Sequence, residues 1–431
     1  MKSLAFLKLA AIPSRKVILS GLLIAILVAP LAMYGYGRYH YEAAQRAQAK
    51  RDFPAARDYL SRCLNNWFYK AEAHLLAART ARRAGDYIEA EQYLRACRAL
   101  GAPTESVDLE SMLLRAQRGD LARAESYLVS RVMEDHPDTI LILEVLTKAY
   151  AQAYRLADAE ECVRRWLERE PEDVLAWTWQ GQLAQDAFNN TEAMRAYARI
   201  VELDPDNDGA RLVLASLLIR QSALEALEHF QHLHRRLGDA PLVLVGLASC
   251  ERNLARPDEA RRLLDMVLPT HPQNWSALAE RARLALEYES PQEAEKWFRR
   301  AIAVIPYEKD MNYGLYRCLV RLGKNEEAET QLAKLKGSEA DLDRLREVIR
   351  AAGQKADDPS FPCEAGQILM RNGQEAAGVR WLQRALARNP SYVPAQRALA
   401  DYYQRTGNSV QAAGHRQPAH ASPDQAPEVA R

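Results

Sequence analysis

The stretch Val174–Asn207, VLAWTWQGQLAQDAFNNTEAMRAYARIVELDPDN, decides the fold. Gly181 lies on one face of a first helix, four residues after an apolar side chain. Tyr197 follows Ala193 by the same interval on a second helix, and Pro205 closes the window. A small residue is needed where two helices cross at close range, and an aromatic ring fills the space beside it. The window therefore predicts a closely packed pair of helices.

The same alanine recurs along the chain at intervals of 33 to 35 residues. The members of this alanine ladder are Ala56, Ala90, Ala124, Ala159, Ala193, Ala226, Ala260, Ala294 and Ala328. The residue four positions after each alanine is apolar in every case: Leu60, Leu94, Leu128, Val163, Tyr197, Phe230, Leu264, Phe298 and Leu332. A fixed period of this length indicates a repeat architecture.

The ladder resembles the tetratricopeptide repeat (TPR) family, in which each repeat is one pair of helices. The resemblance implies an all-α fold, a right-handed superhelical solenoid of about eleven helix pairs. A capping box, Ser338-x-x-Asp341, predicts that a separate connecting helix begins after the ninth repeat. The expected segments are nine repeats in residues 37–342, a connecting helix and loop in 343–358, C-terminal repeats with a capping helix in 359–413, and a disordered tail in 414–431.

A run of 21 uncharged residues, VILSGLLIAILVAPLAMYGYG, precedes the repeats at residues 17–37. About 20 apolar residues in a helix span the roughly 30 Å core of a bilayer. We expect a single transmembrane helix, with a cleaved signal peptide as the alternative. Basic residues in the segment 1–16 place that segment in the cytoplasm, and hence the repeats on the periplasmic or extracytoplasmic side of the inner membrane. This layout resembles that of membrane-anchored bacterial TPR proteins of envelope assembly.

Composition excludes several classes of function. The net charge of +1 argues against nonspecific nucleic-acid binding. Phosphate-binding, nucleophile-elbow, zinc-protease and dinucleotide-binding motifs are absent from the sequence. His229 and His232 share a helix face, but no carboxylate or thiol is spaced to complete a metal site. The sequence therefore predicts no enzyme activity, no small-molecule substrate, no cofactor and no metal, and six packed free thiols in place of disulfides.

The resemblance assigns the inner groove of the solenoid to the first helices of the repeats. Carrying the family's groove positions over to this sequence gives fourteen basic against seven acidic residues. This surplus suggests binding of an acidic peptide. The alternative interpretation is that these arginines only stabilise their own helices, because a positive charge near a helix C-terminus interacts favourably with the helix dipole. The predicted contact residues are Arg79, Arg82, Arg83, Lys148, Arg220, Arg252, Arg283, Tyr313, Arg317 and Arg321.

The function that this pattern supports is a membrane-anchored scaffold that binds a partner peptide or helix in a basic TPR groove. The alternative is an auxiliary subunit of an envelope-assembly or secretion complex. An enzyme is the third and weakest hypothesis.

Overall fold

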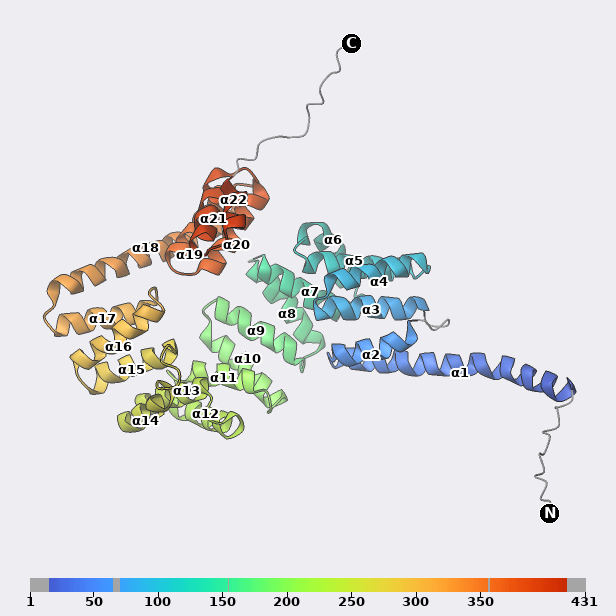
Figure 1. Cartoon of the computed structure of the whole chain (residues 1–431), viewed down its shortest axis with the longest axis horizontal. Helices are drawn as coiled ribbons and strands as arrows, with labels where there is room; N and C mark the ends of the chain where they lie inside the picture. Colours follow the sequence, from blue (N-terminus) through green and yellow to red (C-terminus); the bar gives the residue numbers. More distant parts are fainter. Residues whose placement is uncertain (1–14, 65–69, 154, 356, 417–431) are drawn as a thin grey trace, which may run out of the picture. The chain divides into compact units, whose positions relative to one another are not determined.

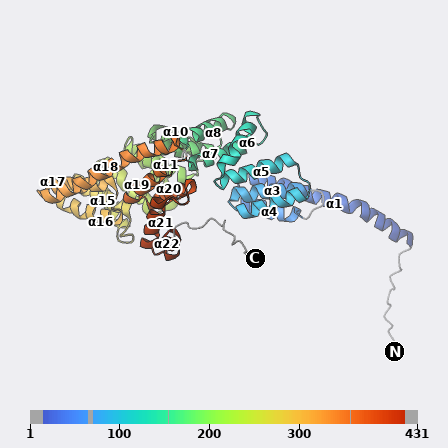
Figure 2. The same cartoon turned by 90° about the horizontal axis from the view of Figure 1, so that it is seen from above.

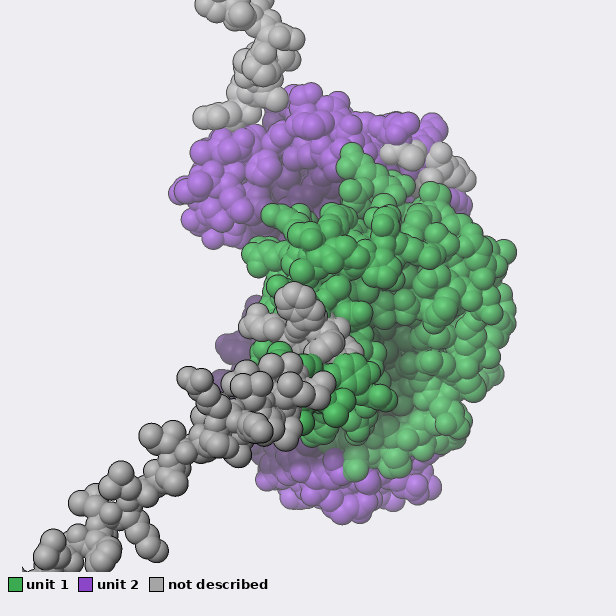
Figure 3. Space-filling view, turned by 90° about the vertical axis from the view of Figure 1, so that its right-hand side faces the viewer, with its two compact units in different colours: residues 1–210 green, residues 211–431 purple. Residues whose placement is uncertain are grey.

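The computed structural model describes residues 15–64, 70–153, 155–355 and 357–416, and within these ranges every regular element is an α-helix. The chain divides into two compact units, Met1–Ala210 and Arg211–Arg431, which are coloured separately in Figure 3. The described helices number 22, which corresponds to the eleven expected pairs.

Odd-numbered helices are the first helices of the repeats, and even-numbered helices are the second (Figure 1). The first five repeats are formed by α1 (Arg15–Ala49), α2 (Phe53–Cys63), α3 (Lys70–Ala84), α4 (Tyr87–Ala99), α5 (Thr104–Gln117), α6 (Leu121–Met133), α7 (Thr139–Gln152), α8 (Leu156–Arg169), α9 (Val174–Asp186) and α10 (Asn190–Leu203). The remaining repeats are formed by α11 (Asp208–Leu218), α12 (Ala223–Leu237), α13 (Pro241–Asn253), α14 (Pro257–Val267), α15 (Trp275–Tyr288), α16 (Pro291–Val304), α17 (Lys309–Arg321), α18 (Asn325–Gln354), α19 (Ser360–Arg371), α20 (Glu375–Arg388), α21 (Val393–Arg405) and α22 (Ser409–Arg416).

The first helices form an inner layer in each unit. Within each unit, helices next to each other in the sequence pack together, as α1 does with α2, α7 with α8 and α15 with α16, and α3, α4 and α5 lie side by side in both views (Figures 1 and 2). First helices also pack on the first helix of the next repeat, as in α3 with α5, α5 with α7, α13 with α15 and α15 with α17. Even-numbered helices have at most marginal contacts of this kind among the described residues. The first helices are therefore on the tighter side of the stack, as the family resemblance implies.

The alanine ladder lies in the core of the repeats. All nine ladder alanines are buried, with at most 4% of their surface exposed. Gly181 confirms the crossing predicted from its window, because a Cβ atom there would lie 2.8 Å from the ring of Tyr197. Phe230 packs in the same way on Gly246, which belongs to the first helix of the following repeat. The ladder aromatics therefore fill gaps within one repeat and also between successive repeats.

Glycine also closes turns between the two helices of a repeat, as predicted. Gly85, Gly119 and Gly323 have φ angles of 90°, 92° and 72°, a conformation that L-residues with side chains rarely adopt. In the reference window, Phe188 occupies this position with φ of 57°. The turn is therefore formed there without glycine, at some cost in backbone strain.

The predicted helix start at Ser338 is wrong. Helix α18 runs without a break from Asn325 to Gln354, so the second helix of the ninth repeat continues through the proposed capping box. Asp341 accepts hydrogen bonds from Arg371 at 2.8 Å and Asn372 at 2.9 Å, both of them at the end of α19. The segment contains no proline and consists mainly of good helix formers, which explains its continuity.

Both ends of the chain fall partly outside the described residues. Helix α22 continues to Arg416, three residues into the predicted tail, and residues 417–431 lie outside the described ranges. The predicted anchor, residues 17–37, belongs to α1, but its side chains at positions 17–27 and 29 are also outside the description. Within the described part of the chain, no helix combines the length and the apolar character needed to cross a membrane.

Candidate partner-binding surface

A buried glutamate ties the second repeat to the third. Glu110 on α5 is 1% exposed and accepts hydrogen bonds from Arg82 at 2.8 Å and from Arg79 at 2.5 Å, both on α3. Arg82 is also 1% exposed, and it donates a further hydrogen bond to Gln117 at 3.0 Å. Burial alone would raise the pKa of Glu110, but the two guanidinium groups outweigh burial and lower that pKa. Glu110 is therefore an ionised group inside the inner layer.

The other two predicted contact residues of α3 are also engaged in ion pairs. Arg79 binds the carboxylate of Asp138, at the start of α7, through hydrogen bonds of 3.0 and 2.8 Å. Arg83 pairs with Glu144 on α7 at 3.1 Å. Arg51, in the turn after α1, pairs with the same glutamate at 3.2 Å. These arginines connect first helices across two repeats and carry little uncompensated charge.

The second unit repeats this arrangement with the same spacing. Arg252 on α13 donates to the buried Glu280 on α15, 28 residues later, just as Arg82 donates to Glu110. A second bond reaches Glu287, 35 residues after Arg252, which corresponds to Gln117 in the first unit. Arg283 on α15 approaches the same Glu280 at 3.2 Å. An arginine near the end of one first helix and a glutamate in the next thus form a recurrent inter-repeat bridge.

These bridges account for part of the predicted basic surplus. Asp138 neutralises Arg79, and Glu280 neutralises Arg252 and Arg283, yet neither acid is a groove position in the family pattern. The 28-residue interval from arginine to glutamate is the sequence signal that would have found the two buried bridges. Arg82 is enclosed by its bridge to Glu110 and is therefore not part of the exposed surface of the first helices.

Three of the remaining predicted contacts lie on α17. Tyr313 is 51% exposed, Arg317 is exposed one turn further along the helix, and their separation of four residues places them on one face. Arg321 is exposed near the end of the same helix and donates to the carbonyl oxygen of Leu286 at 3.3 Å. Tyr316 lies beside Tyr313 with ring centroids 6.0 Å apart. We call Tyr313, Arg317 and Arg321 the α17 face.

Two predicted contacts remain separate from the α17 face. Lys148 is half-buried on α7 of the first unit. Arg220 is exposed, but it lies in the turn after the end of α11 and not on a first helix. That repeat is one residue shorter than its neighbours between ladder alanines, which shifts Arg220 beyond the helix end.

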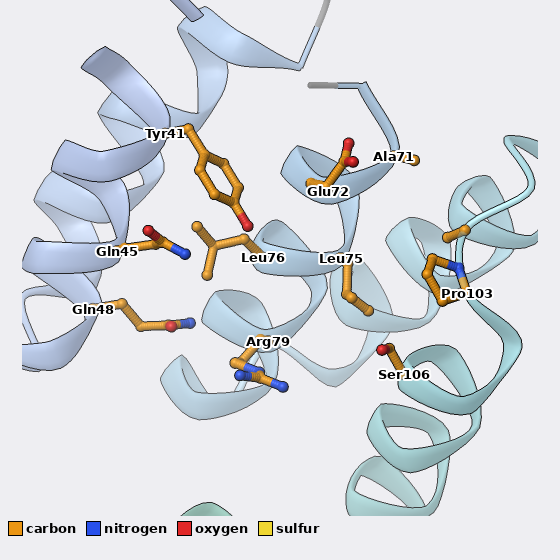
Figure 4. Close-up of a pocket in the computed structure, with 11 residues that line it drawn as sticks. Tyr41, Gln45, Gln48, Ala71, Glu72, Leu75, Leu76, Arg79, Pro103 and Ser106 are labelled. Carbon is orange, nitrogen blue, oxygen red and sulfur yellow. The ribbon is translucent and has the colours of Figure 1, made fainter. Parts of the chain in front are cut away.

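The first unit also contains a pocket that the sequence did not predict. It has a volume of about 430 Å³ and lies among α1, α3 and α5. Figure 4 shows Tyr41, Gln45 and Gln48 of α1 opposite Leu76 and Arg79 of α3. The rest of its lining is Ala71, Glu72, Leu75, Ala102, Pro103 and Ser106. Its volume and mixed lining are those of a site for a small group or side chain.

Reactive and metal-binding groups are sparse in the described residues. All six cysteines are buried free thiols, as predicted. Burial raises the pKa of Cys162 and Cys250 to about 12, which keeps both sulfur atoms protonated at neutral pH. No cluster of three histidine, cysteine, aspartate or glutamate side chains suited to a metal ion occurs in the described ranges.

Comparison with known proteins identifies the repeat. A family model described as tetratricopeptide repeat matches residues 145–208 and 245–310. No curated protein matches the chain in sequence.

Similar solved structures cover different shares of the chain. PilW, a widely conserved type IV pilus biogenesis factor, is 17% identical over 46% of this chain and 92% of its own, with a TM-score of 0.39. A tetratricopeptide repeat protein from Parabacteroides merdae is 20% identical over 58% and 98%, with a TM-score of 0.38. The human IFIT1 dimer with m7Gppp-AAAA is 17% identical over 87% and 93%, with a TM-score of 0.37.

Proposed function

We propose that this chain, which belongs to the tetratricopeptide repeat family, is a scaffold that holds a protein partner against its inner layer of first helices. The proposal rests on the distribution of side chains over that layer. In the first unit the inner arginines are bound to Glu110, Asp138 and Glu144. These arginines therefore connect neighbouring repeats and are not available to a partner. In the second unit the α17 face remains open to solvent.

The α17 face is the observation that carries the proposal. Tyr313 presents a large, half-exposed ring, and Arg317 and Arg321 present guanidinium groups on the same helix. Tyrosine and arginine are the residue types most enriched among the contacts that dominate protein interfaces. Arginine also binds carboxylates through paired hydrogen bonds. An acidic segment of a partner protein therefore fits this surface best.

Partner capture by the full chain tests the proposal. Arg317→Glu should weaken capture of the partner by about tenfold or more, because charge reversal replaces attraction by repulsion. Tyr313→Ala should also weaken capture, through loss of the exposed ring. The matched control is Lys334→Glu, which reverses an exposed charge on α18, the second helix of the same repeat.

Equal capture by Arg317→Glu, Lys334→Glu and the parent chain would exclude the α17 face as the contact surface. Circular dichroism of each variant shows whether the helices are retained, so that a loss of binding is not confused with a loss of fold.

We also propose that residues 17–37 anchor the scaffold in the inner membrane, with the repeats on the extracytoplasmic side. The support is the uncharged 21-residue run and the basic segment before it. The full chain should stay with membranes after alkaline extraction, whereas a chain that lacks residues 1–37 should be released. Mass measurement of the purified full chain distinguishes an intact anchor from a cleaved signal peptide, which would remove about 30 residues.

A further inference from the structure

The pocket among α1, α3 and α5 differs in charge from the α17 face. Arg79 reaches it, but the carboxylates of Glu110 and Asp138 hold that guanidinium. Arg82 pairs with the same Glu110 carboxylate, so the two positive charges of Arg79 and Arg82 are balanced by the two negative charges of Glu110 and Asp138. Glu72, which is exposed on the first turn of α3, adds one more negative charge at the pocket. The local field therefore favours a cation.

The remaining lining supplies uncharged groups that suit a cation with an aliphatic stem. Leu75 and Leu76 offer an apolar wall on α3. Gln48 is 7% exposed, and its amide N–H donates to the hydroxyl of Thr80 at 3.1 Å, which fixes the orientation of the amide. Burial, and next the Glu72 carboxylate, raise the pKa of Tyr41, so its ring is neutral at physiological pH.

We propose that this pocket binds a cationic side chain, arginine or lysine, of a protein partner. The aliphatic stem lies along Leu75 and Leu76, as lysine and arginine stems do on apolar surfaces. The charged head meets the Glu72 carboxylate and the face of the Tyr41 ring, which attract a cation by charge and by the ring quadrupole. The inference rests on the proposed scaffold function and adds a second, oppositely charged recognition site to it.

The test uses the full chain in detergent micelles and three small probes, followed by ligand-detected NMR titration. The probes are the N-acetyl methylamides of arginine, lysine and norleucine; norleucine keeps an aliphatic stem but has no charge. The arginine or lysine probe should bind more tightly than the norleucine probe, and the stronger of the two identifies the preferred head group.

Glu72→Gln should weaken binding of the preferred probe by about two- to fivefold, the effect expected for a partly exposed ion pair. Glu160→Gln is the matched control, because Glu160 is exposed on α8 and is not part of the pocket. Equal affinity for norleucine and the cationic probes, or unchanged affinity in Glu72→Gln, would overturn the proposal.

The outcomes separate this inference from the scaffold function. If the probes fail while Arg317→Glu still weakens partner capture, the pocket proposal falls and the scaffold remains. If the cationic probes bind in a Glu72-dependent manner but Arg317→Glu has no effect, the pocket remains and the α17 face is excluded.

Discussion

The ion pair between Glu110 and Arg82 offers the sharpest test of how the first unit is held together. Both side chains are 1% exposed, and Arg79 shares the same carboxylate. Glu110→Gln removes the negative charge and keeps nearly the same volume, so two guanidinium groups lose a buried counter-charge. Removing one partner of a buried pair typically costs about 3–5 kcal/mol. We expect a loss of unfolding free energy in that range at pH 7.

Glu161 provides a matched control for this substitution. It also pairs with two arginines, Arg164 at 2.6 Å and Arg165 at 2.7 Å, but its side chain is 43% exposed. Exposed pairs contribute less than about 1 kcal/mol, so Glu161→Gln should have a small effect. The contrast between the two substitutions isolates burial as the cause.

Urea unfolding followed by circular dichroism measures the global effect of Glu110→Gln. Hydrogen exchange of the α3 and α5 amides measures the local effect, because repeat proteins open in parts. A change below about 1 kcal/mol by both methods, similar to that of Glu161→Gln, would refute the assignment of Glu110 as an ionised bridge.

The same pair makes stability depend on pH with a defined sign. The folded-state pKa of Glu110 is lowered, so its contribution is fully present above the unfolded-state pKa of about 4.3. The contribution is lost as the pH falls below that value and through the lower folded-state pKa. The parent chain should therefore lose more stability between neutral pH and acid than Glu110→Gln does.

Three further predictions concern the core. Gly246→Ala should cost about 1–3 kcal/mol in unfolding free energy, because the added methyl group overlaps the ring of Phe230; Gly337→Ala, whose methyl group would enter open space, should be neutral or stabilising. Ala193→Leu should cost a similar 1–3 kcal/mol, roughly, because Ala193 is fully buried at a helix crossing, and an unchanged melting temperature would contradict that packing. Cys162, whose pKa burial raises to about 12, should react slowly with Ellman's reagent at pH 8 in the native chain and rapidly in urea, and fast native reaction would show that the thiol is accessible.

The helix crossings were predictable because they depend on side-chain volume at a fixed period. A small residue followed four positions later by an aromatic residue suits a close crossing of two helices. Ala193 and Tyr197 are both buried, and the Tyr197 ring packs on Gly181 of the other helix. The Phe230–Gly246 contact was not predicted, because it joins residues of two different repeats, whereas the predicted crossing joins the two helices of one repeat. The same 16-residue spacing recurs between Phe298 and Gly314, so comparison of adjacent repeats would have revealed it.

The charge of the inner layer was harder to predict than its position. A position rule identified Arg82 and Arg252 as inner residues, and both are on first helices. It could not show that Glu110 and Glu280 would bind them, because an ion pair depends on how far one helix is displaced along the next. The sequence pattern thus located the first helices. Which of their charges are left unpaired could be determined only from the distances between arginine and carboxylate groups in the structure.

Site-specific photo-crosslinking tests the scaffold account most directly. A photoreactive side chain at Tyr313 in the full chain should crosslink a protein partner in cells, and Arg317→Glu in the same chain should reduce that product by about tenfold. The same group at Lys334, on the second helix of that repeat, should give little of the product. Equal crosslinking from both positions, or a product at Tyr313 that is unaffected by Arg317→Glu, would contradict the account.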